Sequence, residues 1–314
     1  MPGGKRILVT GGAGYLGSIM VPQLLAAGHA VTVLDTFMFR QTPFGHICHE
    51  PGLTIVRGDA REASTLRPHL QKADVVIPLA ALVGAPVCER DPTAAVTTNR
   101  DAIKTLVAML STDQLIVTPI SNSGYGIGEK GRHCTEETPL RPVSLYGRTK
   151  VEAEAIALSH ANSISLRLAT VFGMSPRMRL DLLVNDFTWR AVFDRAVVLF
   201  EAHFKRNYIH VRDVALAFMH AMSRSAGMRG QAYNVGLSDA NLSKLELCEV
   251  IAKHIPGFVY TQSNIAEDPD KRDYIVSNAK IEAMGFKPQF TLEDGIRELI
   301  KGYQMFARTP YGNA

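Results

Sequence analysis

Residues 7–17 read Ile7-Leu8-Val9-Thr10-Gly11-Gly12-Ala13-Gly14-Tyr15-Leu16-Gly17, an apolar strand that runs directly into a glycine-rich turn. The glycines at Gly11, Gly14 and Gly17 are spaced three residues apart. Glycine at such positions permits a tight turn, lets the backbone approach a pyrophosphate and allows a helix to pack closely on the strand. The N-terminus of the following helix would offer unpaired N–H groups to the phosphates. The stretch therefore predicts the first strand, turn and helix of a dinucleotide-binding sheet.

The next strand supports this interpretation, because Ala30–Asp35 ends on a carboxylate. At that place Asp35 can accept hydrogen bonds from the hydroxyls of an adenosine ribose. A carboxylate there repels a 2′-phosphate, so NAD is favoured over NADP. Asp59 and Ala60, just after the strand Leu53–Arg57, form a second candidate contact to the adenosine. A purely structural role in a turn would explain an aspartate at position 59 equally well.

Strand and helix patterns alternate through the first half of the chain. Short runs rich in β-branched residues are typical of parallel strands buried on both faces. We expect strands at Lys5–Thr10, Ala30–Asp35, Leu53–Arg57, Ala73–Leu79, Gln114–Ile120 and Ser163–Ala169, and helices at Tyr15–Ala27, 61–72, 93–111 and 146–160.

This alternation predicts an α/β fold, with a doubly wound parallel Rossmann sheet and right-handed crossovers. We assign residues 1–170 to an NAD-binding domain that also carries the catalytic residues. Residues 171–314 are expected to form a smaller, mixed α/β, mainly substrate-binding part, with some segments returning to the first sheet. There is no internal repeat and no linker-like stretch between them.

Composition excludes several other classes of protein. A chain of 314 residues with 46% apolar and 20% charged residues has an ordinary globular balance. The longest uncharged apolar run, Val75 to Cys88, is too short to cross a bilayer and is interrupted by prolines. No association with membranes is therefore expected. An apolar strand lies so close to the N-terminus that no signal peptide is expected either.

Cysteine spacing and net charge argue against several further kinds of site and partner. Cys48, Cys88, Cys134 and Cys248 lie far apart without a CxxC pair, which argues against a zinc site or a disulfide framework. We expect no bound metal, a cytoplasmic location, and ordinary structural roles for these thiols. The net charge of +4 is scattered rather than gathered in a stripe, so a nucleic-acid partner is not expected. A phosphate-bearing small molecule remains compatible with it.

A candidate catalytic pair lies on the helix expected between Ser144 and Ser159. Tyr146 and Lys150 are four residues apart, so their side chains emerge on one face. The ammonium of Lys150 should lower the pKa of Tyr146 and let it act as a general base while hydride leaves the same carbon. Ser121 ends the strand Gln114–Ile120, at the sheet edge where open α/β sheets bind ligands. It is placed to hydrogen-bond the same substrate oxygen.

Together these motifs resemble the extended short-chain dehydrogenase/reductase superfamily, which includes nucleotide-sugar epimerases, dehydratases and 4-dehydrogenases. The resemblance covers roughly residues 5–300 and implies NAD as cofactor and a nucleoside-diphosphate sugar as substrate. Its motifs, in chain order, are Gly11/Gly14/Gly17, Asp35, Leu79-Ala80-Ala81, Ser121 with Tyr125-Gly126, Tyr146/Lys150 and Arg206-Asn207-Tyr208-Ile209-His210-Val211.

The resemblance also implies roles for single residues. Ser121, Tyr146 and Lys150 would be catalytic. Arg206 and Arg272 would bind the pyrophosphate of the substrate, a role that suits the planar guanidinium. The cofactor contacts implied are Gly11, Gly14, Tyr15, Leu16, Gly17, Asp35, Asp59, Ala60, Leu79, Ala80, Ala81, Asn99, Tyr146 and Lys150. The substrate contacts implied are Ser123, Thr170, Arg179, Asn185, Arg206 and Arg272.

One departure from the superfamily pattern is informative. The 4,6-dehydratases carry an Asp-Glu pair directly after the catalytic Ser or Thr, whereas this chain has Asn122 and Ser123. Elimination of water needs a proton donor and a base, so we expect no dehydratase activity. The family's Arg-Asp-Phe also becomes Arg206-Asn207-Tyr208, which keeps the arginine.

Three segments, 122–129, 175–187 and 267–274, resemble the GDP-heptose 4-dehydrogenases of bacterial capsule biosynthesis. Those enzymes oxidise the C4 hydroxyl of the sugar and keep the resulting NADH tightly bound. Two alternatives stay open: a nucleotide-sugar 4-epimerase that returns the hydride to the opposite face, and a non-catalytic NAD-sensing protein. The resemblance further implies a homodimer formed through the helices near 93–111 and 146–160.

Overall fold

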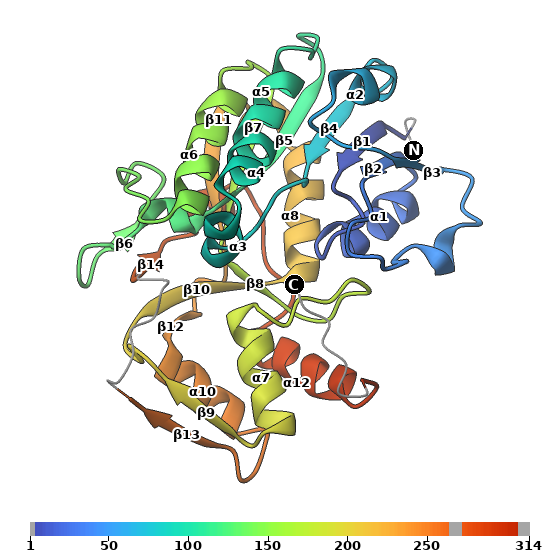
Figure 1. Ribbon diagram of the computed structural model, residues 1–314. Helices are drawn as coiled ribbons and strands as arrows, with labels where there is room; N and C mark the ends of the chain where they lie inside the picture. Colours follow the sequence, from blue (N-terminus) through green and yellow to red (C-terminus); the bar gives the residue numbers. More distant parts are fainter. Residues whose placement is uncertain (1–3, 264–271, 307–314) are drawn as a thin grey trace.

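The computed structural model describes residues 4–263 and 272–306, and its largest feature is a twisted parallel sheet with helices on both faces (Figure 1). Seven strands pair in the order β11-β7-β5-β4-β1-β2-β3, and every pair is parallel. This confirms the predicted α/β, doubly wound fold. The strands are β1 (Arg6–Thr10), β2 (Ala30–Asp35), β3 (Leu53–Arg57), β4 (Val75–Pro78), β5 (Leu115–Ser121), β7 (Ser163–Leu168) and β11 (Gln231–Val235).

The two faces of the sheet are covered by different helices, as the alternation of side chains along β1 shows. Ile7 and Val9 lie in the apolar cluster that also contains residues of α1 (Gly17–Ala26) and α8 (Val211–Ser223). Leu8, between them, lies in a separate cluster with residues of α2 (Ala63–Leu70) and α5 (Ala102–Val107). Successive side chains of a strand point to opposite faces, so both faces of β1 are buried.

Strand β3 corrects one expectation. The sequence predicts a strand buried on both faces, but β3 lies at the edge of the sheet, and no further strand pairs with it within residues 4–263 and 272–306. Ile55 is 43% exposed and Thr54 is exposed as well. Edge strands lose one neighbour, and β-branched composition alone does not distinguish an edge strand from a central one.

The single helix expected over 93–111 is divided in the structure. It consists of α4 (Pro92–Val96), a π-helical turn at Thr97–Asp101 and α5, and it is preceded by a helix that was not predicted, α3 (Ala85–Arg90). Single π-helical turns within α-helices are frequent at functional sites. Here the turn places Asn99 in the interior with 1% of its surface exposed.

The second half of the chain contributes both to the large sheet and to a smaller part beside it (Figure 1). β11 completes the large sheet beside β7, and α8 covers one of its faces. The smaller part contains a three-stranded sheet, β12-β10-β8, and the two-stranded pairs β13-β9 and β14-β6. The elements of the chain not yet given a range, some of which pack on the large sheet, are η1 (Gly45–Ile47), η3 (Asn122–Tyr125), β6 (His133–Cys134), α6 (Leu145–Leu158), β8 (Thr170–Phe172), α7 (Leu183–Phe193), β9 (Ala196–Leu199), β10 (Lys205–His210), α9 (Ser225–Met228), β12 (Asn241–Ser243), α10 (Lys244–Ala252), β13 (Val259–Gln262), β14 (Ile275–Val276), α11 (Ala279–Ala283) and α12 (Leu292–Tyr303).

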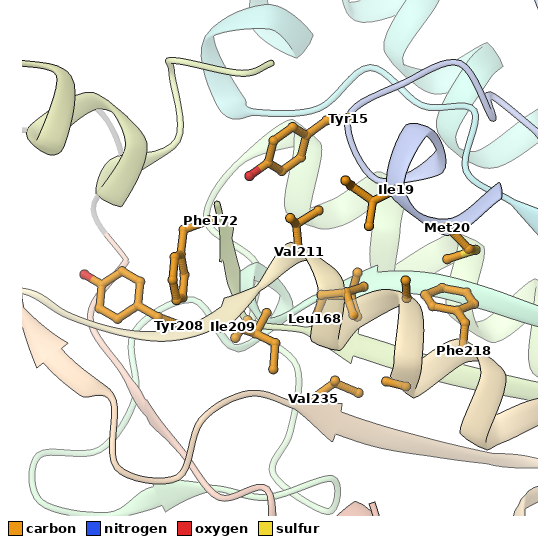
Figure 2. Packing of buried hydrophobic residues seen from close by; sticks show 14 of the residues in the cluster. Tyr15, Ile19, Met20, Leu168, Phe172, Tyr208, Ile209, Val211, Phe218 and Val235 are labelled. Carbon is orange, nitrogen blue, oxygen red and sulfur yellow. The ribbon is translucent and has the colours of Figure 1, made fainter. Parts of the chain in front are cut away.

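The two halves share one continuous apolar core (Figure 2). In Figure 2, Tyr15 and Ile19 at the start of α1 lie near Val211 at the start of α8, with Phe172 of β8 beside them. This packing fixes the glycine turn against the smaller part. Within the described ranges, no helix is long and apolar enough to cross a membrane.

Candidate active site

The glycine turn connects β1 to α1 at the carboxyl edge of the sheet, and its shape depends on the absence of side chains. Gly11 has a φ of +68°, and a Cβ at this position would overlap the backbone of Ala80. A Cβ at Gly17 would overlap the backbone of Gly12. The turn is thus a bare-backbone cradle in front of a helix N-terminus, which fits the pyrophosphate of a dinucleotide.

Asp35 lies where the ribose of the adenosine is expected, and it also organises the turn. One carboxylate oxygen accepts a hydrogen bond from Ala13 N at 2.9 Å, and the other accepts one from Phe37 N at 2.8 Å. Each oxygen retains capacity for a further bond, because a carboxylate oxygen has two lone pairs. The carboxylate therefore joins the end of β2 to the glycine turn and remains able to bind a ribose.

Two other predicted cofactor segments lie beside the turn. Leu79 N donates to Thr10 O at 2.8 Å, which brings the Leu79–Ala81 segment against β1. Asp59 forms an ion pair with Arg61, whose side chain approaches it to 2.5 Å and holds the pKa of the Asp59 carboxyl below its usual value. An adenine contact by Asp59 stays a prediction, since the structure shows this carboxylate engaged with Arg61.

Asn99 connects the cofactor segments to the catalytic helix. Its side chain accepts from Leu82 N at 2.8 Å, donates to Leu82 O at 2.9 Å and donates to Thr149 Oγ1 at 3.3 Å. Thr149 lies between the two residues of the catalytic pair and is 1% exposed. The sequence interpretation missed it, although its place between Tyr146 and Lys150 was a signal.

Ser121, Tyr146 and Lys150 come together between the end of β5 and the start of α6. Ser144 caps α6 by accepting from Gly147 N at 3.1 Å, which starts the helix just before Tyr146. The Ser121 side chain faces Tyr146 closely enough to help stabilise the phenolate form of Tyr146. Lys150 follows one helical turn later and is only 6% exposed. The structure thus brings the three predicted catalytic residues together.

The pKa of Tyr146 is raised above its ordinary value, which corrects the predicted lowering. Burial is the largest cause, because it disfavours the charged phenolate. The positive charges of Arg179 and Arg272 and the hydrogen bond with Ser121 act in the opposite direction. Burial also lowers the pKa of Lys150 to about 8, so the ammonium itself is costly here. The arginines, rather than the lysine alone, supply the field that favours the phenolate.

Cys88 is a neighbour of the catalytic pair that sequence reasoning did not find. The thiol is fully buried, donates to Leu82 O at 3.3 Å, and has its own pKa raised by burial. Its charge state influences the pKa of both Tyr146 and Lys150. No spacing in the sequence signalled this position, because it depends on how α3 folds back toward α6.

Glu154 was also missed, although it continues the Tyr146–Lys150 face of α6 by one further turn. Its carboxylate accepts from Ser165 Oγ at 2.5 Å and from Arg167 Nη2 at 2.8 Å, and its side chain is 5% exposed. Its negative charge raises the pKa of Lys150 in part, against the effect of burial. The buried Glu154–Arg167 pair therefore anchors α6 to β7 beneath the catalytic lysine.

Among the predicted substrate residues, Asn185 and Arg179 lie at the junction between glycine turn and smaller part. Asn185 is fully buried, accepts from Gly173 N at 3.0 Å, and donates to Arg179 O at 2.9 Å and to Tyr15 Oη at 3.2 Å. Every polar atom of its side chain is thus engaged within the chain, so the structure gives it a positioning role. Arg179 forms an ion pair with Asp181, and its positive charge also acts to lower the pKa of Tyr146.

The remaining predicted substrate residues lie around the same end of the fold. Thr170 starts β8 and pairs with Tyr208 of β10. Arg206 is 3% exposed, and its guanidinium lies 5.6 Å from the ring centroid of Tyr274. Arg272 is close enough to influence the pKa of Tyr146. The structure therefore associates Arg272 with the reacting end of the site.

Asn122 and Ser123 follow Ser121 in a short 3₁₀ turn, and each is 1% exposed. Neither the amide of Asn122 nor the hydroxyl of Ser123 has a hydrogen-bond partner in the described part of the chain. No carboxylate occupies either position, as the sequence already showed. Across residues 4–263 and 272–306, no group of three His, Cys, Asp or Glu side chains is arranged to hold a metal ion.

A parallel sheet with a glycine cradle, a ribose-side aspartate and a Ser-Tyr-Lys cluster defines the class of NAD-dependent short-chain dehydrogenase/reductase-like proteins. Residues 7–236 match the model of the NAD dependent epimerase/dehydratase family, and the chain belongs to that family. It is 30% identical to the low-salt glycan biosynthesis protein Agl12 of Haloferax volcanii, over 95% of this chain and 98% of the relative. It is 29% identical to dTDP-glucose 4,6-dehydratase of Streptomyces griseus, over 95% and 94% of the two chains.

Solved structures agree with this assignment. The structure of UDP-glucose 4-epimerase from Thermus thermophilus, in complex with NAD, superposes with a TM-score of 0.80 at 25% identity, covering 96% of this chain and all of the other. The family description and the NAD complex of this neighbour identify NAD as the cofactor.

Proposed function

We propose that this chain oxidises the C4 hydroxyl of a nucleoside-diphosphate sugar to a ketone. The observation that carries the proposal is the grouping of Ser121, at the end of β5, with Tyr146 and Lys150 one turn apart on α6, at the carboxyl edge of a dinucleotide-binding sheet. The named relatives, a glycan biosynthesis protein, a dTDP-glucose dehydratase and a UDP-glucose epimerase, support this class of substrate.

In the proposed mechanism each residue of the cluster has a separate task. The glycine turn and Asp35 hold NAD, which when bound accepts the hydride from C4. Tyr146 takes the proton of the C4 hydroxyl as its phenolate, a form favoured by Arg179, Arg272 and Ser121. Ser121 also orients the reacting oxygen.

The neutral side chains of Asn122 and Ser123 support oxidation without elimination. Removing water from a sugar needs a side chain that donates a proton and another that accepts one. An amide and a hydroxyl in a buried turn supply neither at neutral pH. We therefore propose that the reaction stops at the ketone, which excludes the dehydratase outcome seen in one named relative.

More narrowly, we propose a GDP-heptose 4-dehydrogenase acting in surface-polysaccharide biosynthesis. Support comes from the segments 122–129 and 175–187, whose sequences resemble that subgroup; the third segment, 267–274, lies largely outside the described residues. A nucleotide-sugar 4-epimerase would use the same residues and is the second candidate, because one structural neighbour in complex with NAD is a UDP-glucose 4-epimerase.

One experiment distinguishes the two reactions and tests the proposal. Purified protein is mixed with GDP-, UDP- and dTDP-sugars in a single turnover, and NADH absorbance and product masses are followed. A dehydrogenase accumulates NADH together with a 4-keto sugar; an epimerase returns to NAD with an epimer of unchanged mass. Absence of both products with every sugar, from protein that binds NAD, would contradict the proposal and favour a non-catalytic NAD-binding protein.

We also propose a homodimer formed through the helical segments near 93–111, which contains α4, the π-helical turn and α5, and near 146–160, which contains α6; α5 and α6 pack side by side on one face of the sheet (Figure 1). Sedimentation equilibrium tests it. A species at the mass of one chain at all concentrations would contradict the dimer. A cytoplasmic location stays a prediction.

A further inference from the structure

The buried carboxylate of Glu154 lies one helical turn beyond the catalytic lysine. Residues four apart on a helix are neighbours on its surface, so Tyr146, Lys150 and Glu154 follow one another along one face of α6. A carboxylate and an ammonium at this spacing are placed to form an ion pair. Within residues 4–263 and 272–306, however, no ion pair joins Glu154 to Lys150. Other contacts of the carboxylate therefore keep these two buried charges apart.

Arg167, on the neighbouring strand β7, binds the carboxylate instead. Its Nε and Nη2 donate to Glu154 at 3.0 Å and 2.8 Å, one to each carboxylate oxygen. Ser165, two residues earlier on β7, donates a further hydrogen bond from its hydroxyl at 2.5 Å. Two parallel N–H···O bonds fix the orientation of a carboxylate as well as its position. Glu154 is thereby directed toward β7 rather than along the helix face toward Lys150.

The guanidinium of Arg167 is itself fixed by a second set of contacts. Its Nη1 donates to Tyr125 Oη and to Glu136 O, each at 3.1 Å. Tyr125 Oη in turn donates to Asn234 Oδ1 of β11 at 2.7 Å. All three nitrogens of the guanidinium are therefore hydrogen-bonded within the chain, which gives the arginine, and with it the carboxylate of Glu154, one preferred position.

The position of Glu154 matters because Lys150 is balanced between its charged and neutral forms. Burial lowers the pKa of Lys150 to about 8, and the charge of Glu154 opposes this in part. An opposite charge in direct contact ordinarily shifts a pKa by about 1–3. A carboxylate free to reach Lys150 would hold it as a paired ammonium. Such a pair has no net charge and would do little to favour the phenolate of Tyr146.

Few other charges act on Lys150. Burial apart, its pKa responds to Cys88, on α3, and to Glu154. Tyr146 is the titratable group one turn earlier on α6. The remaining charged side chains of α6 and of the helical segments packed on it are at least partly exposed: Glu89, Arg90, Arg100, Asp101, Lys104, Arg148 and Glu152. Glu154 is thus the buried carboxylate whose placement decides whether Lys150 is paired.

We propose that Arg167 is a positioning residue for Lys150: by holding Glu154 against β7, it keeps the catalytic ammonium unpaired on the helix face that carries Tyr146. The separation of Glu154 from Lys150 is independent of the substrate. Its consequence for hydride transfer rests on the proposed oxidation, so the two are measured separately.

The separation is tested by stability, without any sugar. Between pH 8 and 10.5 the contribution of Lys150 to stability rises with pH, so the difference between wild type and Lys150→Met begins to change near pH 8. The same pair of proteins is compared in the Arg167→Met background by urea unfolding. There the change should begin at a pH at least about one higher, because Glu154 is free to pair with Lys150. In the background Arg167→Met/Glu154→Gln it should begin near pH 8 or below, since no carboxylate remains.

Hydride transfer shows whether this separation matters for catalysis. In Arg167→Met, single-turnover NADH formation should slow about tenfold, because a rise of about one in the pKa of Tyr146 lowers its phenolate fraction tenfold. The double variant Arg167→Met/Glu154→Gln should recover to within about threefold of wild type, since replacing both members of a buried ion pair is often close to neutral. Arg6→Met is the control. It removes an exposed pair with Asp74 at the start of β1 and should leave both measurements as in the wild type.

Three outcomes would overturn the positioning role. An unchanged onset near pH 8 in folded Arg167→Met would mean that Glu154 does not reach Lys150. A double variant as slow as Arg167→Met would mean that the arginine only anchors α6 to β7. If Arg167→Met does not fold, the double variant decides alone: slow hydride transfer in folded protein, or an onset well above pH 8, overturns the proposal. If the wild type itself transfers no hydride from any sugar, the proposed oxidation fails, while the stability comparison still tests Arg167.

Discussion

The glycine turn and the catalytic face of α6 both serve the same site, but they are built in different ways. At Gly11 and Gly17 the chain contributes backbone shape, and a single added Cβ would overlap other backbone atoms. At Tyr146 and Lys150 it contributes side-chain chemistry, whose properties depend on burial and on neighbouring charges. Substitutions in the turn should therefore change folding and cofactor binding together. Substitutions on the helix face should change rate and pH dependence while the fold persists.

The largest expected effect is that of Tyr146→Phe. The ring and its packing remain, but the proton acceptor is lost, so hydride transfer should slow by about 10²–10⁴, the usual worth of general acid–base catalysis. Single-turnover NADH formation against pH measures this, with thermal unfolding and NAD affinity as checks that the fold is intact. Ser121→Ala should cost less, because it removes only a neutral hydrogen bond. Tyr260→Phe, on β13, is the matched control. An unchanged transfer rate in Tyr146→Phe would remove the proposed mechanism.

The second effect concerns Lys150 and tests whether the helix face can be altered without loss of stability. Burial lowers the pKa of Lys150 from 10.5 to about 8, so between these values the unfolded chain binds a proton that the folded chain lacks. The contribution of Lys150 to the free energy of unfolding therefore rises with pH from about 8 to 10.5. Lys150→Met removes it. The stability of the variant relative to wild type should be greatest near pH 7 and should decline by up to about 3 kcal/mol across that window.

Urea unfolding of both proteins without added nucleotide, at several pH values, measures this difference. Comparing the two proteins cancels the contributions of the buried cysteines and tyrosines that do not interact with Lys150, whereas Cys88 is coupled to Lys150 and contributes to the difference. A difference in stability that does not vary with pH would mean that the lysine is not desolvated in the folded protein. Lys150 would then no longer be an example of a side chain whose pKa is set by burial, and the contrast with the glycine turn would be weakened.

A third prediction concerns Arg206 and Arg272, the two arginines in the second half of the chain that are expected to bind the substrate. Arg206→Ala and Arg272→Ala should weaken binding of the nucleotide sugar about ten- to a hundredfold, because each removes a charge-assisted contact. NAD affinity should change little. Arg272→Ala should also raise the pKa seen in the rate profile, since the charge of Arg272 favours the phenolate of Tyr146. Equal losses of NAD affinity in both variants would show that these arginines face the cofactor or support the fold.

The smallest effect is expected in the glycine turn, and there it should appear in folding and binding at once. Gly17→Ala places a methyl group against the backbone of Gly12 and should cost about 1–3 kcal/mol of stability, with a parallel loss of NAD affinity. Gly45→Ala is the control, because a Cβ at Gly45 would meet nothing within 4 Å. A folded Gly17→Ala protein with full stability but weak NAD binding would contradict this prediction, because NAD binding would then change without any change in the stability of the turn.

The sequence was most informative where the governing interactions are local. The strand-turn-helix with its glycine spacing, the carboxylate at the end of β2 and the i,i+4 pair on α6 all depend on short stretches of chain, and the structure places them as predicted. The parallel, doubly wound character of the sheet also followed from the alternation of patterns. The edge position of β3 could not be predicted, because composition does not indicate which strand of a sheet lacks a neighbour.

The rest of the site depends on contacts between distant parts of the chain. Cys88 reaches the catalytic lysine only because α3 folds back, and Asn185 reaches Tyr15 only across the junction of the two halves. The burial of Arg177 was not predicted, because an arginine is ordinarily a surface residue. Even the direction of the Tyr146 pKa was mispredicted, because the extent of burial cannot be judged from spacing along one helix.

The position of β11 has a consequence for how the protein is made. Its neighbour β7 ends at Leu168, but β11 begins only at Gln231, about 60 residues later in the chain. At translation rates of about 5–20 residues per second, the open edge of β7 waits roughly 3–12 s for its partner strand. β7 is buried along its whole length in the finished sheet, so during synthesis it has an open edge of unpaired backbone groups with which other chains can pair. Ribosome-bound chains that end before Gln231 should therefore depend on chaperones, and chains that extend past Val235 should not.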